Sequence, residues 1–361
     1  MIHDLALYVS REGFVAVDSH TRNIPQQVRH LSFVEGCSVD LDLFPKSRSV
    51  RSILFPISGL GSDSENLMNE WVSRYKYLRY LDLSDSSFET MPNSIAKLQH
   101  LRFLGLSRNN EIRTLPHSIC KLLQLQELDL GGCMELENFP KGLGKLISLR
   151  RLTITTQQSV LPHDEFASLI HLQTLIFSDC DNIKFLFKQK LPSIEELYVE
   201  SCGCLESLPL YIFPKLQTLY INNCEINLLL NNESPIQTLR MKHLYLLCSS
   251  SLMTLPEWIA CDTLETLAIH GLSNLKILPV FPSTMTRLKR LHITKCPQLL
   301  ILPSDTHRLT TLEDLIIRGC PELCRKCQCQ SGEYWPMISH IKAISIVLEQ
   351  SLCSMRSESA Y

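Results

Sequence analysis

The chain has 361 residues, of which 45% are hydrophobic and 20% charged, and its formal net charge is -2. This length suffices for a large core, and the balanced charge argues against a dedicated nucleic-acid binder, which needs a concentrated basic face. No apolar run approaches the length of a membrane span, and 15 cysteines, an odd number, exclude a disulfide framework that is complete within one chain.

The N-terminal segment Met1–Phe14 is not typical of a signal peptide, because Asp4 lies within its apolar part and it has no basic n-region. Without secretion, the cysteines are expected to be reduced thiols. The single glycosylation sequon, Asn232-Glu233-Ser234, is then expected to be unused.

A repeated strand motif follows. Two weak copies lie at Val28–Phe33 and Val50–Phe55, and residues 62–78 predict a helix with Ser or Asp at its N-cap. The pattern L-x-x-L-x-L then recurs, with starts 22 to 24 residues apart up to Leu216 and 24 apart from Leu264 onward. The copies begin at Leu78, Leu101, Leu125, Leu149, Leu172, Ile194, Leu216, Leu264, Leu288 and Leu312. This period is typical of leucine-rich repeats.

Each copy predicts a short strand whose leucines point inward, while the residues between them face solvent on the concave side. One repeat cannot bury its own apolar face, so neighbouring copies stack into a parallel sheet. The predicted fold is therefore an α/β leucine-rich-repeat solenoid, or horseshoe, with a parallel concave sheet and short helices or irregular segments on the convex side.

The convex side is expected to vary along the chain. Residues 91–98, 115–122 and 139–146 combine a proline with apolar residues at helical spacing, which predicts short helices with proline in the first turn. Later segments, such as 183–186, look more irregular.

Two places depart from the regular repeat. The copy at Ile236–Met241 is predicted to begin early, which leaves 28 residues before Leu264 and implies a widened or kinked repeat. At the C-terminal end an open solenoid needs a cap. Apolar residues of the tail are expected to provide it: Trp335, Ile338, Ile341 and Ile344.

The cysteines follow the repeat. In six copies a cysteine comes eight residues after the first leucine, where Asn109 stands in another copy: Cys133, Cys180, Cys202, Cys224, Cys296 and Cys320. A cysteine is small, apolar enough to bury, and has a weak S–H donor. The spacing therefore predicts an internal ladder rather than reactive thiols, and a bridge between rungs ~4.8 Å apart would strain the stack.

The cluster Cys324-Arg-Lys-Cys327-Gln-Cys329, with His340 downstream, leaves zinc open as an alternative to a reduced cap segment. One C-x-x-C without a second pair is weak evidence. The chain has no G-x-S-x-G elbow and no G-x-x-x-x-G-K-[ST] loop. We therefore expect neither enzymatic activity nor a bound cofactor.

Function is expected on the concave face, where aromatic and arginine side chains favour protein hot spots; for any single residue, a merely solvated role is the alternative. The candidate protein-binding residues are Arg79, Tyr80, Arg102, Phe103, Glu127, Asp129, Arg150, Arg151, Glu195, Glu196, Tyr198, Tyr220, Lys289, Arg290 and His292. Residues 71–155 hold 12 Lys/Arg and 8 Asp/Glu, residues 194–240 hold 2 and 6, and residues 286–330 hold 8 and 4. This alternation of sign favours oriented docking of a charged protein.

Three stretches resemble one known family. "IHDLALYVSRE" at Ile2–Glu12 is similar to a winged-helix segment "MHDLxHDLA", "VRHLSF" at Val28–Phe33 to the entry of a first repeat, and "GEYWPMISHIKAI" at Gly332–Ile344 to a C-terminal "GEDWPKIAHI". These are features of plant disease-resistance proteins of the coiled-coil, nucleotide-binding, leucine-rich-repeat (NLR) type. The resemblance implies a winged-helix remnant and linker over 1–25, repeats over 26–325, and a cap and tail over 326–361.

The chain also departs from that family. Ile2-His3-Asp4 matches the second "HDLA" copy and not the Met-His-Asp triad that reads the nucleotide in the family. The triad, the coiled coil and the ADP/ATP-binding module are therefore missing from this sequence. We expect it to be a fragment, a truncated gene product or the result of a mis-set gene start.

The resemblance implies a protein-recognition and autoinhibitory domain of an intracellular immune receptor. Its expected partners are a pathogen effector or guarded host protein and the nucleotide-binding module of the full receptor, with no nucleic acid. The expected location is cytoplasmic, with a nucleocytoplasmic or membrane-peripheral location through the full receptor left open. The alternative is a stand-alone leucine-rich-repeat adaptor or decoy without a nucleotide switch.

Overall fold

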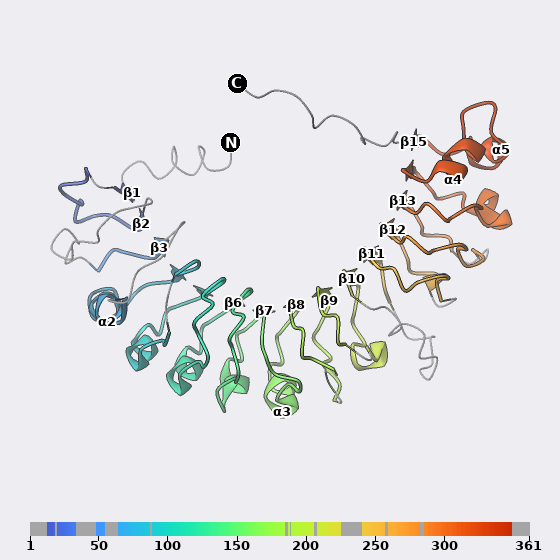
Figure 1. Cartoon of the computed structure of the whole chain (residues 1–361). Coiled ribbons are helices and arrows are strands. Elements are labelled where there is room, and N and C mark those ends of the chain that lie inside the picture. Colours follow the sequence, from blue (N-terminus) through green and yellow to red (C-terminus); the bar gives the residue numbers. More distant parts are fainter. Residues whose placement is uncertain are drawn as a thin grey trace, which may run out of the picture. The chain divides into compact units, whose positions relative to one another are not determined.

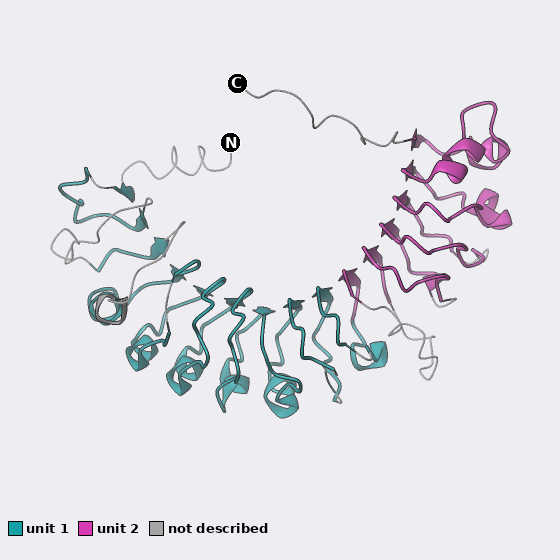
Figure 2. Ribbon diagram, in the orientation of Figure 1, with its two compact units in different colours: residues 1–215 teal, residues 216–361 magenta. Residues whose placement is uncertain are grey.

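The computed structural model describes residues 13–18, 20–33, 48–54, 64–86, 89–184, 187, 189–205, 208–224, 240–256, 259–281 and 285–348. The chain forms two compact units, residues 1–215 and 216–361 (Figure 2). In each unit, strands lie along one side and short helices along the other (Figure 1). The strands follow one another in chain order from β1 to β15.

Within the described ranges, the strands of unit 1 are short: β1 (Phe14–Val17), β2 (His30–Phe33), β3 (Ser52–Leu54), β4 (Tyr80–Asp82), β5 (Phe103–Gly105), β6 (Glu127–Leu130), β7 (Arg151–Ile154), β8 (Thr174–Ser178) and β9 (Glu196–Glu200). Each strand pairs in parallel with the next. The ladder includes β1, so the parallel sheet starts before residue 26.

Unit 2 continues the pattern with β10 (Thr218–Asn222), β11 (His243–Leu247), β12 (Thr266–His270), β13 (Arg290–Thr294), β14 (Asp314–Arg318) and β15 (Ala343–Val347). These strands are also parallel neighbours. The fold is thus the predicted leucine-rich-repeat solenoid. We number each repeat from the first apolar residue of L-x-x-L-x-L, which is position 1.

The core consists of the apolar residues of the motif. Position 4 is fully buried in successive strands, as Leu104, Leu128 and Leu152 show, and in β6 and β7 the residues between the buried ones stay at least partly exposed. This alternation follows from the two-residue period of a strand. A parallel ladder keeps the same face inward in every repeat.

The helices of unit 1 are α2 (Ser64–Arg74), α3 (His163–Ala167) and the 3-10 turns η2 (Asn93–Lys97), η3 (His117–Lys121), η4 (Leu143–Lys145) and η5 (Leu210–Ile212). The helix predicted within residues 62–78 is α2, and its expected Ser or Asp N-cap, before Ser64, lies outside the described residues. The prolines do not lie in the first turns as predicted: Pro92 and Pro116 are extended N-caps. Gly142, with φ 93°, shortens the third turn to three residues.

The predicted early repeat at Ile236–Met241 is wrong. Strand β11 pairs with β10 so that Leu244 lies opposite Leu219 and Leu246 opposite Ile221. Position 1 is therefore Met241, which is 1% exposed, and residues 236–239 lie outside the described residues. Two overlapping apolar patterns share Met241, and the sheet uses the later one. The repeat is not widened on its C-terminal side.

A left-handed residue confirms this register. Position 8 has positive φ in nearly every repeat from Leu78 onward, and position 8 counted from Met241 is Cys248, with φ 50°. The others are Asp85, Arg108, Gly132, Asp179, Ser201, Asn223, Gly271, Lys295 and Gly319. The chain makes the same tight turn after every strand from β4 to β14 except β7, where position 8 is Thr156. Only three of these turns carry the glycine that such a turn favours.

The C-terminal end of unit 2 is covered by α4 (Pro321–Lys326) and α5 (Trp335–Ile338), with η9 (Ser304–Arg308) before them. Ile338 and Ile341 are buried, and Trp335 and Ile344 are partly buried. These are the four residues expected to close the last repeat. Strand β15 adds one more rung to the sheet beyond residue 326.

Candidate protein-recognition face

The register places the outward side chains of unit 1 in two rows along the strand face. Position 3 gives the first row: Tyr80, Phe103, Glu127, Arg151, Thr174 and Glu196. Position 5 gives the second row: Asp82, Gly105, Asp129, Thr153, Ile176 and Tyr198. Neighbours in a row are one strand spacing apart, ~4.8 Å, so a partner could contact several at once.

An aromatic pair opens the first row. The rings of Tyr80 and Phe103 stack with centroids 4.1 Å apart and an interplanar angle of 4°. Burial, together with the nearby carboxylates of Asp82, Glu127 and Asp129, raises the pKa of Tyr80 to about 12. The phenol is therefore neutral at physiological pH and offers a hydroxyl beside an apolar platform.

Gly105 makes close packing beside this pair feasible. A Cβ at this position would lie 2.6 Å from Asp82 Oδ1 and 3.0 Å from a ring carbon of Phe103. The missing side chain leaves a low point in the second row, with Asp82 on one side and Asp129 on the other. The aromatic pair thus borders an acidic part of the face.

The acidic groups of β6 are partly buried. Burial raises the pKa of Asp129, although Asp129 Oδ1 accepts a hydrogen bond from Gly131 N at 2.9 Å. Burial also raises the pKa of Glu127, whose carboxylate lies 3.4 Å from Arg151 Nε. Glu127 and Arg151, two of the predicted binding residues, therefore meet each other on the face.

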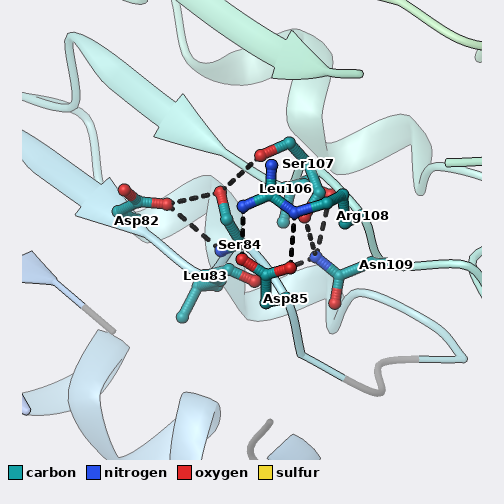
Figure 3. Close-up of polar contacts among 8 residues, drawn as sticks. All are labelled: Asp82, Leu83, Ser84, Asp85, Leu106, Ser107, Arg108 and Asn109. Atoms are coloured by element: carbon teal, nitrogen blue, oxygen red, sulfur yellow. Dashed lines mark hydrogen bonds and ion pairs between the residues drawn. The ribbon is translucent and has the colours of Figure 1, made fainter. Parts of the chain in front are cut away.

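Polar side chains bridge the turns that follow β4 and β5, as drawn in Figure 3. Ser84 Oγ donates to Asp82 Oδ1 at 2.6 Å, and Ser107 Oγ donates to Ser84 Oγ at 2.8 Å. The guanidinium of Arg108 pairs with Asp85, the left-handed residue of the repeat before it. These contacts fix the edge of the face on which Tyr80 and Phe103 stand.

The predicted interior ladder lies behind the face. Asn109 Nδ2 donates to Leu83 O at 2.9 Å, which is position 6 of the previous repeat. Cys133 Sγ makes the equivalent bond to Leu106 O at 3.1 Å, and Cys180 Sγ to Ile154 O at 3.5 Å. All six cysteines at this place are buried. Burial raises the pKa of Cys133 to about 12, so this thiol stays protonated.

Unit 2 has its own strand face. Tyr220 and Tyr245 are neighbours at position 5, with ring centroids 6.1 Å apart. His292 Nε2 lies 2.8 Å from Asp314 Oδ2, and both Nε and a terminal nitrogen of Arg290 donate to Thr266 Oγ1. This face combines aromatic, imidazole and charged groups.

The predicted binding residues lie either within the strands or directly before them. Ten lie within strands at positions 3 and 5: Tyr80, Phe103, Glu127, Asp129, Arg151, Glu196, Tyr198, Tyr220, Arg290 and His292. Five precede their strands at position 2, at the edge of the face: Arg79, Arg102, Arg150, Glu195 and Lys289. The three arginines are exposed, and their backbones join one ladder, in which Arg102 N donates to Arg79 O at 2.8 Å.

Sequence reasoning missed two parts of these surfaces. Tyr245 was overlooked because the repeat containing it was placed in the wrong register. Tyr77 stacks on His100 with centroids 5.3 Å apart, and Arg51 lies over the Tyr77 ring at 5.5 Å. Both rings stand just before position 1, a place outside the strand motif but identifiable from the repeat alignment.

The C-terminal cysteines are packed into the cap. Cys324 Sγ donates towards Ile317 O and Val347 O at 3.6 and 3.5 Å, and burial raises the pKa of Cys327 to about 12. Cys329 is exposed. Within the described ranges, no group of three or more His, Cys, Asp or Glu side chains is arranged to hold a metal ion.

Comparisons with solved structures reveal similar solenoids. The chain is similar to TLR13 in its complex with ssRNA13, at 16% identity and a TM-score of 0.55, over 89% of this chain and 47% of that chain. It is also similar to a chain of the glycosylated Toll–Spatzle complex of Drosophila, at 18% identity and a TM-score of 0.55, over 89% and 51%. At these identities the likeness shows the fold alone, and the chain spans about half the length of each.

No curated protein matches the chain. In the part of the chain that the structure describes, no helix has the length and apolar character needed to cross a bilayer. A family model described as "Leucine-rich repeat region" matches residues 27–268, about two thirds of the sequence. The chain therefore belongs to the leucine-rich-repeat region family.

Proposed function

We propose that this chain is the non-enzymatic protein-recognition part of a plant immune receptor of the NLR type. The observation that carries the proposal is the strand face of unit 1, where the stacked pair Tyr80 and Phe103 lies beside acidic and basic side chains in two ordered rows. Rigid aromatic anchors surrounded by polar groups are what protein interfaces use. The end motifs of the sequence support the receptor family.

The early repeats would hold the nucleotide-binding module of the full receptor in its inactive state. Four arginines are the candidates for this contact: Arg79, Arg102, Arg150 and Arg151. Arg151 already faces Glu127 at 3.4 Å, so the three exposed arginines at position 2 carry most of this role.

The later repeats would bind a pathogen effector or a host protein that it modifies. The unit 2 face offers Tyr220, Arg290 and His292 for this purpose, together with Tyr245. Such a ligand activates the receptor only by its differential affinity for the open and closed states. We place this function in the cytoplasm. A location at a membrane or in the nucleus would arise only through the full receptor.

The second candidate function is a stand-alone adaptor or decoy. It has the same recognition face but no nucleotide switch to restrain. The two functions differ in what the gene encodes upstream of Met1. A reading frame that continues into a P-loop supports the receptor, and a frame that does not supports the adaptor.

The activity test uses the receptor encoded by that longer frame, expressed in leaf tissue. Replacing Arg79, Arg102 and Arg150 by Glu should cause cell death without a pathogen, because the restraining contact is lost. The matched control replaces Lys276 and Lys295, exposed lysines of unit 2, by Glu and should stay silent. A triple variant that is stable and silent contradicts autoinhibition by the early repeats.

A further inference from the structure

One edge of unit 1 exposes an apolar side chain at the same place in three consecutive repeats. Leu123, Ile147 and Ile170 stand two residues before position 1 and are 49%, 51% and 59% exposed. Each backbone N–H donates to the carbonyl two residues earlier, at 3.0, 2.8 and 3.0 Å respectively. The identical turn places the three side chains in one line, one per repeat.

Cations lie beside this apolar line and in the two repeats before it. Lys121 and Lys145 stand two residues before Leu123 and Ile147, where Ile170 has Ser168, and Lys97 has the same place one repeat earlier. At position 2, Arg150 follows Ile147, whereas the other two repeats carry Gln126 and Gln173; Arg79 and Arg102 hold position 2 in the two repeats before Leu123. We call these six cations and the three apolar residues the basic edge: Lys97, Lys121, Lys145, Leu123, Ile147, Ile170, Arg79, Arg102 and Arg150. None of the six cations has a carboxylate partner among the residues that the structure describes.

The nearest acidic residues of the neighbouring helix α3 are already engaged. Glu165 accepts hydrogen bonds from Gly142 N at 2.7 Å and Gly144 N at 2.8 Å. Asp164 Oδ1 accepts one from Gln189 Nε2 at 2.9 Å. The six-residue segments 97–102, 121–126 and 145–150 contain no acidic residue. The basic edge therefore combines uncompensated positive charge with a central apolar line.

The spacing of this line indicates what could cover it. Neighbouring strands are ~4.8 Å apart, and one α-helical turn rises about 5.4 Å. A helix lying across the repeats can therefore bring one apolar side chain per turn onto the line. Acidic residues beside its apolar stripe would reach Lys121 and Lys145 on one side and Arg150 on the other.

We propose that the basic edge binds an acidic amphipathic helix of a partner protein, about three turns long. The proposal rests on the proposed role of the chain in protein recognition. It names a surface beside the strand face, which shares Arg79, Arg102 and Arg150 with the proposed restraining contact and adds the lysines and the apolar line. A nucleic acid would leave the central apolar line uncovered. A bilayer would gain little from it, because the chain itself already covers about half of each of these side chains.

The test measures the binding of a synthetic, fluorescently labelled 15-residue peptide to the full chain by anisotropy. The peptide carries one Leu per helical turn with Glu on either side, and a scrambled peptide of the same composition serves as the ligand control. The designed peptide should bind at least tenfold more tightly than the scrambled one. Equal binding of the two peptides, or no binding of either, overturns the proposal.

Variants then assign the binding to the basic edge. Replacing Lys121 and Lys145 together by Glu should weaken binding about tenfold, whereas replacing Lys276 and Lys295 by Glu, the same change in charge, should alter it less than twofold. Ile147→Ser should weaken binding about fivefold, since its half-exposed side chain loses apolar contact. The matched control is Ile277→Ser, at a site that is 50% exposed in unit 2.

Two further measurements distinguish the basic edge from a lipid-binding surface and from the strand face. Ile147→Ser should not change the binding of vesicles that contain phosphatidylserine. If this variant weakens vesicle binding and the peptide does not bind, the basic edge is a lipid surface and the proposal is overturned. The double variant Tyr80→Ala/Phe103→Ala disrupts the strand face. It should leave peptide binding within twofold, so failure of the basic edge and failure of the proposed strand-face recognition can be told apart.

Discussion

The buried amide of Asn109 offers a direct test of the interior ladder. Its side chain is fully buried, and Nδ2 donates to Leu83 O at 2.9 Å and Leu106 O at 2.8 Å. Asn109→Ala removes both bonds, each of which contributes about 1 kcal/mol, and leaves a buried acceptor at a cost of about 1–3 kcal/mol. We expect a loss of stability of about 2–4 kcal/mol.

Asn109→Cys is the matched variant, because the chain itself uses cysteine at this place. Cys133 Sγ reaches Leu106 O at 3.1 Å, so a thiol at residue 109 should reach Leu83 O in the same way. Asn109 Oδ1 is buried without a hydrogen-bond partner. Both substitutions remove that unpaired oxygen, so the difference between them reports the thiol, that is, its S–H donor together with its buried sulfur.

Urea unfolding, followed by circular dichroism and compared through midpoints at constant slope, measures this difference. We expect the cysteine variant to lose about 1 kcal/mol and to lie about 1–2 kcal/mol above the alanine variant. If the two variants unfold at the same midpoint, neither the S–H donor nor the buried sulfur contributes to stability, and the ladder bond of the cysteines is refuted as a stabilising contact.

Three other substitutions test the face and its turns. Gly105→Ala should destabilise the chain by about 1–3 kcal/mol in the same assay, because its Cβ would approach Asp82 Oδ1 to 2.6 Å; an unchanged midpoint would show that the Asp82 side chain moves aside freely. Burial raises the pKa of Asp129 above its ordinary value of 3.8, so the folded state binds the carboxyl proton more tightly than the unfolded state does. The stability of the fold therefore falls as the pH rises from 3.8 through the pKa of the folded state. Asp129→Asn should therefore stabilise the chain at pH 7, by an amount that shrinks as the pH falls towards 4. A stability difference that does not change with pH would show that the titration of Asp129 is not its cause. Lys295→Gly should raise stability by about 0.5–1 kcal/mol, because φ is 52° there and a side chain disfavours that conformation, whereas a loss of stability would assign the lysine side chain a contact of its own.

The repeat was predictable from sequence because its signal is physical and periodic. The leucines at positions 4 and 6 have the two-residue period of a strand, and the whole motif with its leucine at position 1 recurs along the chain. These residues must be buried together, so the parallel sheet and its inward face followed directly. The buried cysteines were predictable for the same reason: position 9 faces the interior in all the copies that carry a cysteine there, whereas the copy that starts at Leu149 has the exposed Gln157. At Met241 the prediction failed, since two apolar patterns overlap there and only pairing with β10 distinguishes them.

The site was less predictable than the fold. Position alone assigned Tyr80, Phe103 and Glu127 to the exposed side of their strands. It could not show that the centroids of the two rings lie 4.1 Å apart, or that the carboxylate of Glu127 forms an ion pair with Arg151. Such pairings depend on rotamers in adjacent repeats, and a single sequence does not determine them.

The left-handed turn at position 8 explains how one scaffold carries such different surfaces. It follows every strand from β4 to β14 except β7, and its φ is near 50–74° whether the residue is Gly132, Asp85 or Lys295. The backbone is therefore set by the buried leucines and the ladder behind it, and not by the intrinsic preference of the residue in the turn. Side chains in front of that backbone can change without changing its path. This independence lets Arg108 pair with Asp85 in one repeat while Gly132 leaves the equivalent place bare in the next. A recognition surface that varies from repeat to repeat requires such a separation between the residues that hold the shape and the residues that contact a partner.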